Sequence, residues 1–190
     1  MLARPFAVLL LLSAFVFTPS AQAQNEVLAR QEASAVKNAV SAFYRAAQGG
    51  RNFRKMDTRL VSEELNALFQ LAKAVEKRSA REISASDHPA DKPLLLEGAV
   101  LTPYYEGYNK VLVIENIRKM GSAYRADVKL TYDLEQPQFV WTDTTVVVRE
   151  DGRWRVDDVL FQQNETGAGG SVKGTLRDFA GVGNRVCSQY

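Results

Sequence analysis

The chain has 190 residues, of which 24 are basic and 22 are acidic, so its net charge is +2. This near balance argues against a nucleic acid as a partner, because nucleic-acid binding needs a basic stripe, and against an anionic membrane surface. A single cysteine, Cys187, cannot form an internal disulfide, and a single histidine, His88, cannot build a multi-histidine metal site. The length fits one domain with a sizeable core.

The first 23 residues have the three regions of a secretory signal peptide. Arg4 supplies the positive charge, residues 5–17 are almost wholly apolar, and Ala21-Gln22-Ala23 places small residues where signal peptidase needs them. The apolar run is too short for the roughly 20 residues that span a bilayer. We therefore expect cleavage before Gln24, export to the periplasm or medium, and a mature chain of net charge +1 with no membrane insertion.

Two amphipathic helices are predicted in the first half of the mature chain. From Glu26 to Ala47 apolar residues recur at helical spacing, and Gly49-Gly50 follows as a stop signal. A second helical region runs to about Arg81, with Ser62 as a candidate cap. Their expected apolar faces contain Leu28, Val36, Val40, Phe43 and Ala47 in the first helix, and Val61, Leu65, Leu68, Ala72 and Val75 in the second.

The second half of the chain changes to the periodicity of strands. Apolar and polar residues alternate most clearly from Tyr124 to Tyr132, which indicates a half-buried strand. The other predicted strands are Lys110–Ile117, Val140–Glu150 and Arg153–Phe161. Residues 162–190 are interpreted as a Gly-rich tail with one short helical turn, which opens at Thr175–Asp178 and stops at Gly181.

Two registers are open for the last hairpin. A two-residue turn at Asp151-Gly152 pairs Glu150 with Arg153, whereas a three-residue loop with a bulge at Gly152 pairs Arg149 with Arg153. We favour the bulged loop, with positive φ at Gly152, because it separates apolar and basic residues onto two faces. It places Val146, Val148, Trp154 and Val156 on the inner face, and further along Thr142, Thr144, Asp158 and Leu160.

Two helices followed by four antiparallel strands, with the hairpin of residues 146–158, resemble the nuclear-transport-factor-two-like (cystatin-like) superfamily. Residues 92–108, with Glu97-Gly98 and Tyr105-Glu106-Gly107-Tyr108, are similar to uncharacterised bacterial exported domains. The resemblance implies an α+β fold over residues 24–161, in which N-terminal helices pack on a curved antiparallel sheet of about four strands around a conical pocket. The superfamily includes isomerases, hydrolases, transport adaptors and binding domains, so the fold does not select a function.

Asp158 is the candidate for catalysis, because burial on the inner face would raise its pKa and suit it to proton abstraction. Tyr124 or Tyr132 could then stabilise an oxyanion from the neighbouring strand. The alternative is that Asp158 is solvated or pairs with an Arg or Lys. The only histidine lies in a loop, which weakens the case for catalysis. The candidate ligand-binding residues of the cone are Tyr124, Tyr132, Thr144, Trp154 and Asp158.

Two loop clusters complete the list of candidates. Asp87, His88 and Asp91 match no cation-binding spacing, so we expect neither a metal nor a cofactor. Tyr104, Tyr105 and Tyr108 form an aromatic cluster of the kind enriched at recognition surfaces. The alternative is that these rings simply lie over the open end of the domain.

The sequence favours an exported binding domain without enzymatic activity. Its ligand would be a small apolar molecule in the cone or a partner protein of the envelope, as in an immunity protein or inhibitor. The sequence does not decide whether the protein forms a homodimer. The alternative is a cofactor-independent isomerase or hydrolase with Asp158 as general base. An enclosed pocket where Asp158 and a tyrosine converge would favour catalysis, and a filled cone would favour an interaction role.

Overall fold

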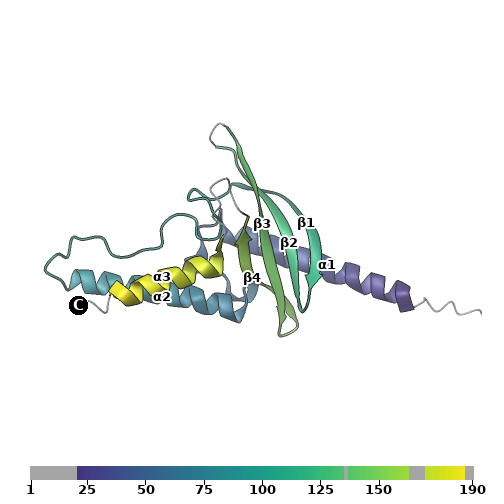
Figure 1. Ribbon diagram of the computed structural model, residues 1–190, viewed down its shortest axis with the longest axis horizontal. Coiled ribbons are helices and arrows are strands. Elements are labelled where there is room, and N and C mark those ends of the chain that lie inside the picture. Colours follow the sequence, from purple (N-terminus) through teal and green to yellow (C-terminus); the bar gives the residue numbers. More distant parts are fainter. Residues whose placement is uncertain (1–20, 135–136, 163–169, 187–190) are drawn as a thin grey trace, which may run out of the picture.

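The computed structural model describes residues 21–134, 137–162 and 170–186, which form an α+β fold (Figure 1). Its elements are α1 (Ala21–Ala47), 3-10 turns at Phe53–Lys55 and Thr58–Leu60, α2 (Glu63–Ser84), β1 (Lys110–Met120), β2 (Ala123–Tyr132), β3 (Phe139–Glu150), β4 (Arg153–Phe161), β5 (Gly170–Ser171) and α3 (Val172–Val186). The predicted α+β class, with N-terminal helices and an antiparallel sheet, is confirmed. The sheet has five strands rather than four, because the two residues of β5 pair with the end of β4.

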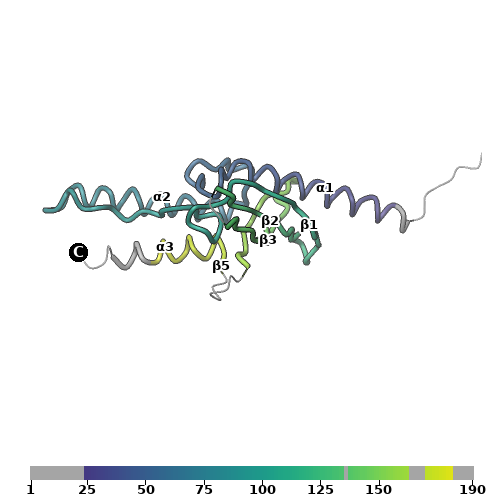
Figure 2. The backbone as a smooth tube through the Cα atoms, turned by 90° about the horizontal axis from the view of Figure 1, so that it is seen from above, coloured from purple at the N-terminus to yellow at the C-terminus, as the bar shows by residue number. Residues whose placement is uncertain are grey.

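The strands lie in the order β1-β2-β3-β4-β5, and every neighbouring pair is antiparallel. Helix α1 crosses one face of this sheet, which we call the inner face, and contacts β1 to β4. Figure 2 shows α1 leaving the sheet on one side and α2 with α3 on the other. The alternation predicted for β2 is confirmed, because Ala126, Val128 and Leu130 are fully buried on the inner face.

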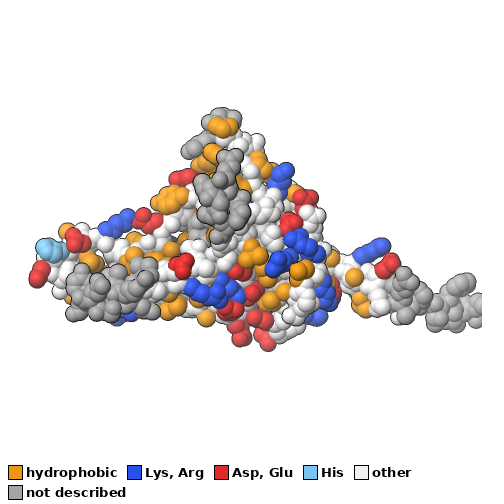
Figure 3. Space-filling model, in the orientation of Figure 1, with side chains coloured by type: hydrophobic (Ala, Val, Ile, Leu, Met, Phe, Trp, Pro, Cys, Tyr) orange, Lys and Arg blue, Asp and Glu red, His pale blue; other side chains and the backbone are white. Residues whose placement is uncertain are grey.

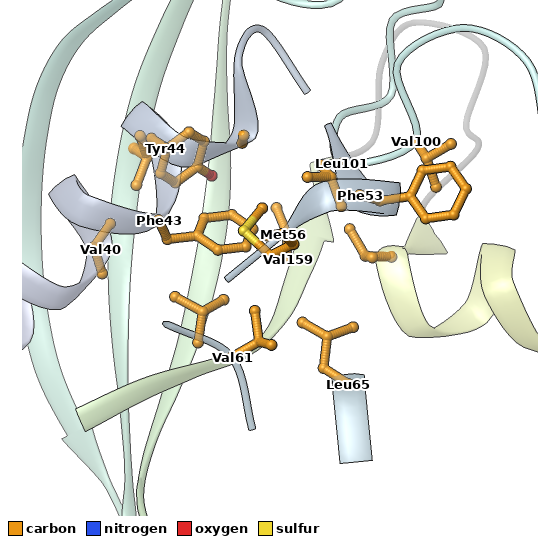
Figure 4. Packing of buried hydrophobic residues seen from close by; sticks show 14 of the residues in the cluster. Val40, Phe43, Tyr44, Phe53, Met56, Val61, Leu65, Val100, Leu101 and Val159 are labelled. Carbon is orange, nitrogen blue, oxygen red and sulfur yellow. The ribbon is translucent and has the colours of Figure 1, made fainter. Parts of the chain in front are cut away.

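One continuous core fills the space between α1 and the sheet (Figure 4). Its largest fully buried side chains include Phe43 of α1, Phe53 of the first 3-10 turn, and Leu65 and Phe69 of α2. Burying a side chain of this size stabilises the fold by roughly 1.5–3 kcal/mol. Leu28, predicted to face the core, is instead 58% exposed, because the first turns of α1 extend past the sheet.

The end of α1 and the start of α2 form as the sequence predicts. Ser62 caps α2, with its hydroxyl accepting a hydrogen bond of 3.0 Å from Leu65 N. After α1, the chain turns through positive φ at Gln48, Gly49 and Gly50. This turn sends the chain back toward the loop that precedes β1, where Leu101 N donates to Gly50 O at 3.0 Å.

The predicted tail is wrong, because α3 is a helix of 15 residues rather than one turn. Ser171 directly precedes the helix, and its hydroxyl accepts a hydrogen bond from Gly174 N at 3.1 Å. Leu176 and Phe179 are buried in this helix, which packs beside α2. This burial outweighs the weak helix propensity of the glycines, since tertiary packing supplies most of the stability of a helix in a protein.

The favoured register of the last hairpin is also wrong. Glu150 pairs with Arg153 through the two-residue turn, in which Asp151 and Gly152 have φ of 49° and 75°. Positive φ at both positions matches the right-handed twist of the strands, as in a type I′ turn. Only the positive φ of Gly152 is confirmed. The bulge lies further along, at Asp157, where Val147 pairs with Val156 but Val146 pairs with Asp158.

Two sequence predictions concern regions that the structure leaves largely outside its description. The signal peptide falls outside the described residues except for Ala21–Ala23, at the start of α1, and Cys187 lies outside them too. Within the described ranges, no helix combines the length and the apolar character needed to cross a membrane.

Candidate functional site

The five predicted ligand-binding residues do not form one site. Tyr124 and Trp154 lie at one end of the inner face, and Tyr132 lies at the other, eight residues along β2. At about 3.3 Å per residue, the two ends are roughly 26 Å apart. Thr144 and Asp158 occupy the opposite, outer face. Each is the direct neighbour in sequence of a residue that is fully buried on the inner face, Thr145 on β3 and Val159 on β4.

At the end with Tyr124 and Trp154, the polar groups of the two rings and of the depression beside them are taken up by contacts within the protein. The two rings meet edge to face at 5.1 Å, and Tyr124 Oη donates to Glu32 Oε2 of α1 at 2.7 Å. Burial and this hydrogen bond raise the pKa of Tyr124 to about 12, so the phenol stays neutral. Lys119 lies over Tyr124, and Arg149 lies over Trp154. Protein cations therefore cover both rings.

Asp158 is placed by the bulge in β4. Without the bulge it would share the inner face with Val156, but the extra residue puts Val159 there instead. Burying a valine in place of a carboxylate avoids a large desolvation cost. Asp158 Oδ1 accepts hydrogen bonds from Val159 N at 2.9 Å and from Lys173 N, in the first turn of α3, at 3.0 Å. The carboxylate therefore anchors the start of α3 and does not meet a tyrosine.

Thr144 also has a structural partner. Its hydroxyl donates to Asp127 Oδ1 at 2.9 Å, and Arg118 contacts the same carboxylate from β1. Thr144 is thus part of a hydrogen-bonded group across the outer face of three strands.

Tyr132 lies in the most clearly aromatic depression of the described surface, which we call the aromatic cleft. It is hollowed into the inner face where the β2–β3 hairpin extends beyond the core, and its volume is about 240 Å³. Five aromatic rings line it: Tyr104, Tyr105, Tyr132, Phe139 and Trp141. In Figure 3 hydrophobic side chains gather on this projecting hairpin at the top of the molecule. The predicted tyrosine cluster therefore contributes two of its three rings to a site.

The loop of residues 98–108 is fixed tightly enough to hold its rings in place. Ala99 N donates to Tyr105 O at 2.8 Å, and Tyr108 N donates to Gly49 O at 3.2 Å. The third predicted tyrosine, Tyr108, points into the core, where its hydroxyl donates to Tyr44 O at 2.7 Å. Gly107 has φ +80°, and a Cβ there would overlap the carbonyl oxygen of Gly49. Only glycine allows this approach of the loop to the end of α1.

The rings of the cleft also support one another. Tyr104 packs on Trp141 with ring centres 4.5 Å apart, and on Phe139 at 6.2 Å. Tyr105 is 63% exposed and lies against Gly98, where a side chain would collide with its ring. The cleft is therefore open to solvent and lined by rings whose positions are set by packing.

A buried carboxyl group lies beneath the cleft. Asp143 is fully buried on β3, and Trp141 Nε1 donates to its Oδ2 at 3.2 Å. Burial raises the pKa of Asp143 to about 7, although the Trp141 N–H and the Thr102 hydroxyl pull it down. The hydroxyl of Thr102 faces the carboxyl without a hydrogen bond of normal geometry, and Asp143 Oδ1 has no partner among the described residues. The tyrosines that face it are Tyr44 and Tyr108.

The one carboxylate among the residues that line the cleft is paired. Glu106 Oε2 accepts a hydrogen bond from Arg51 at 2.7 Å. Across the described residues, no three side chains of His, Cys, Asp and Glu are grouped so as to hold a metal ion. The cleft can therefore offer aromatic surface, but no free nucleophile or metal ligand among these groups.

Comparison with known proteins gives no family. No family model matches the chain, and no curated protein matches it. A solved structure of a protein of unknown function from Bacteroides thetaiotaomicron is 17% identical, with 74% of this chain and 98% of that chain covered and a TM-score of 0.40. A structural similarity this low assigns neither a family nor a function to the chain. The nuclear-transport-factor-two-like resemblance therefore stays a prediction.

Sequence reasoning missed Phe139, Trp141 and Asp143. The three alternate along β3, and Trp141 and Phe139 pair with Leu130 and Tyr132 of β2. The signal was the alternation itself, since every second residue of a strand shares a face. It was missed because the favoured hairpin register assigned the opposite set of β3 residues to the inner face.

Proposed function

We propose that this chain is an exported, non-enzymatic binding protein that holds one small, compact group of a ligand in the aromatic cleft. The observation that carries the proposal is the convergence of five aromatic rings on an open site of about 240 Å³. This volume is below the roughly 300–1,000 Å³ of sites for drug-sized ligands, so the cleft suits a small molecule or one group of a larger one. The N-terminal apolar segment supports export.

The contacts of the carboxylates favour binding over catalysis. The predicted general base, Asp158, accepts hydrogen bonds from the backbone at the start of α3. Glu106 is bonded to Arg51, and Asp143 has no exposed surface from which to reach a substrate. A general base must lie within hydrogen-bond reach of the proton that it removes. These positions give the isomerase or hydrolase alternative no support.

The packing of the inner face favours a site at the end of the sheet over one between α1 and the sheet. The conical pocket implied by the nuclear-transport-factor-two-like resemblance would lie between α1 and the sheet, where Val40, Phe43 and Val147 are fully buried. A ligand is easier to accommodate at the end of the sheet, where the same face opens into the aromatic cleft. If the superfamily proposal holds, the cleft corresponds to an open end of the cone.

Removal of one cleft ring tests this proposal. Choline and 3,3-dimethylbutan-1-ol are two small alcohols of the same shape, and we expect at least one to bind saturably in calorimetric titrations, with a dissociation constant in the millimolar range. The variant Tyr105→Ala should weaken that binding at least about fivefold, because it removes stacking surface worth about 1 kcal/mol or more. Tyr105 is 63% exposed, so its loss should leave folding intact.

Leu134→Ala is the matched control. Leu134 is 74% exposed on the same hairpin but does not line the cleft, so its removal should leave the affinity unchanged. Absence of saturable binding of both compounds would contradict the proposed function. Equal weakening in the two variants would also contradict it, because binding would then follow general surface hydrophobicity.

A further inference from the structure

The aromatic rings of this protein differ in how they are covered. Outside the cleft, three rings have one of the protein's own cations over them: Arg54 lies 4.4 Å from the ring centre of Phe53, Lys119 lies 5.7 Å from that of Tyr124, and Arg149 lies 5.6 Å from that of Trp154. Among the described residues, no Lys or Arg takes such a position over the five rings of the cleft. Apart from the contacts that these rings make with one another and with Gly98, their faces are left to solvent or to a ligand.

The rings of the cleft are also of the types that attract cations most strongly. Trp is the best cation–π partner and Tyr follows, and four of the five rings are Trp or Tyr. The Trp141 N–H donates to a carboxyl group, Asp143, at 3.2 Å. A hydrogen bond to a carboxylate polarises the donor, so the indole of Trp141 becomes richer in electrons than a free indole.

The basic groups close to the cleft are paired with carboxylates. Arg51 binds Glu106, which lines the cleft, and Lys92, which interacts electrostatically with Tyr105, binds Glu97. Beneath the floor, Asp143 contributes negative charge whenever it is ionised. A positively charged group in the cleft would therefore contact ring faces, with the Asp143 carboxyl buried beneath them and paired charges nearby.

We propose that the aromatic cleft selects a compact organic cation of the quaternary ammonium class over a neutral group of the same shape. This inference rests on the proposed binding function and names its ligand class. A trimethylammonium head occupies on the order of 100 Å³, if each heavy atom takes about the 30 Å³ of a liquid water, so the cleft of about 240 Å³ can hold it. Its charge is spread over methyl groups, which lowers the cost of leaving water for an aromatic site.

Choline and 3,3-dimethylbutan-1-ol test the selection, because they differ in having nitrogen or carbon at the branched centre. Calorimetric titration of the full mature chain should give choline at least about fivefold the affinity of the alcohol, within the range of a cation–π contribution. The variant Tyr105→Leu should lower the affinity for choline several-fold and leave that for the alcohol nearly unchanged, since leucine keeps apolar surface but has no ring face. Leu134→Ala should change neither affinity.

The outcomes separate this inference from the proposed function. Equal affinities, or tighter binding of the alcohol, would overturn the cation selection while the cleft remained a binding site. Loss of both ligands in equal proportion in Tyr105→Leu would also overturn it, because the ring would then act only as apolar surface. No saturable binding of either compound would overturn both proposals.

Discussion

The variant Asp143→Asn is expected to be more stable than the wild-type protein at alkaline pH. Burial raises the pKa of Asp143 to about 7 in the folded chain, against 3.8 for an unperturbed Asp. The folded state therefore binds this proton more tightly than the unfolded state. The resulting stability is fully present below about pH 4 and is lost as the pH rises through about 7. At 1.36 kcal/mol per pKa unit, ionisation costs about 4 kcal/mol.

Asn keeps the shape of the carboxyl group and an oxygen for the Trp141 N–H, but it does not ionise. The free energy of unfolding of Asp143→Asn should therefore match that of the wild type near pH 4 and exceed it by about 2–4 kcal/mol near pH 8. Urea denaturation at a series of pH values measures this difference. A constant difference over the whole range would contradict the burial of an ionisable group at this position.

Asp127→Asn is the matched control, with the opposite sign. Burial raises the pKa of Asp127, but hydrogen bonds from Arg118, Thr144 and Asn116 outweigh it and hold the pKa below its usual value. This carboxylate contributes stability above the pKa of an unfolded Asp, and the contribution is lost as the pH falls. The control should therefore be less stable than the wild type at neutral pH and approach it in acid.

The variant Gly107→Ala is expected to lose at least about 3 kcal/mol of stability. The φ of +80° at Gly107 is unfavourable for a residue with a side chain. The new Cβ of alanine would also overlap the carbonyl oxygen of Gly49. Relieving the overlap would separate the loop from the end of α1 and break the hydrogen bond from Tyr108 N to Gly49 O. Because Gly107 also lines the aromatic cleft, ligand affinity should fall with stability.

Gly121→Ala separates backbone strain from steric overlap. Gly121 has a similar φ of +64°, but an added Cβ would meet nothing within 4 Å. This control should lose only about 1 kcal/mol, the cost of left-handed backbone for alanine. Thermal and urea unfolding of both variants give the comparison. Equal losses would show that the loop of residues 98–108 is not held against α1 as the structure describes.

Local signals in the sequence predicted the parts of the fold that depend on local chemistry. Ser62 caps α2 and the alternation in β2 faces the core, because capping and strand periodicity act over a few residues. Helix α3 was missed because Gly174 and Gly181 weaken a helix in isolation. Its stability comes from partners distant in sequence, such as Glu64 of α2 and Asp157 of β4, which both bind Lys173.

The candidate site was harder to predict because its residues depend on register. A slip of one residue in a strand exchanges its two faces, so the choice of turn at Asp151-Gly152 decided whether Thr144 or Asp143 faced inward. The bulge at Asp157 then reversed the faces again for Asp158. Tyr132 and Tyr105 were identified as recognition residues, but their convergence with Trp141 requires the pairing of β2 with β3 and the fixed loop before β1.

The central claim is that ligands bind in the aromatic cleft and not at the other end of the inner face. The chain has two tryptophans, one at each end, so the indole N–H signals in a ¹H–¹⁵N NMR spectrum report on the two places separately. On titration with whichever of choline and 3,3-dimethylbutan-1-ol binds more tightly, the signal of Trp141 should shift saturably while that of Trp154 stays in place. A shift of Trp154 alone, or of neither signal at concentrations that saturate binding, would contradict the account.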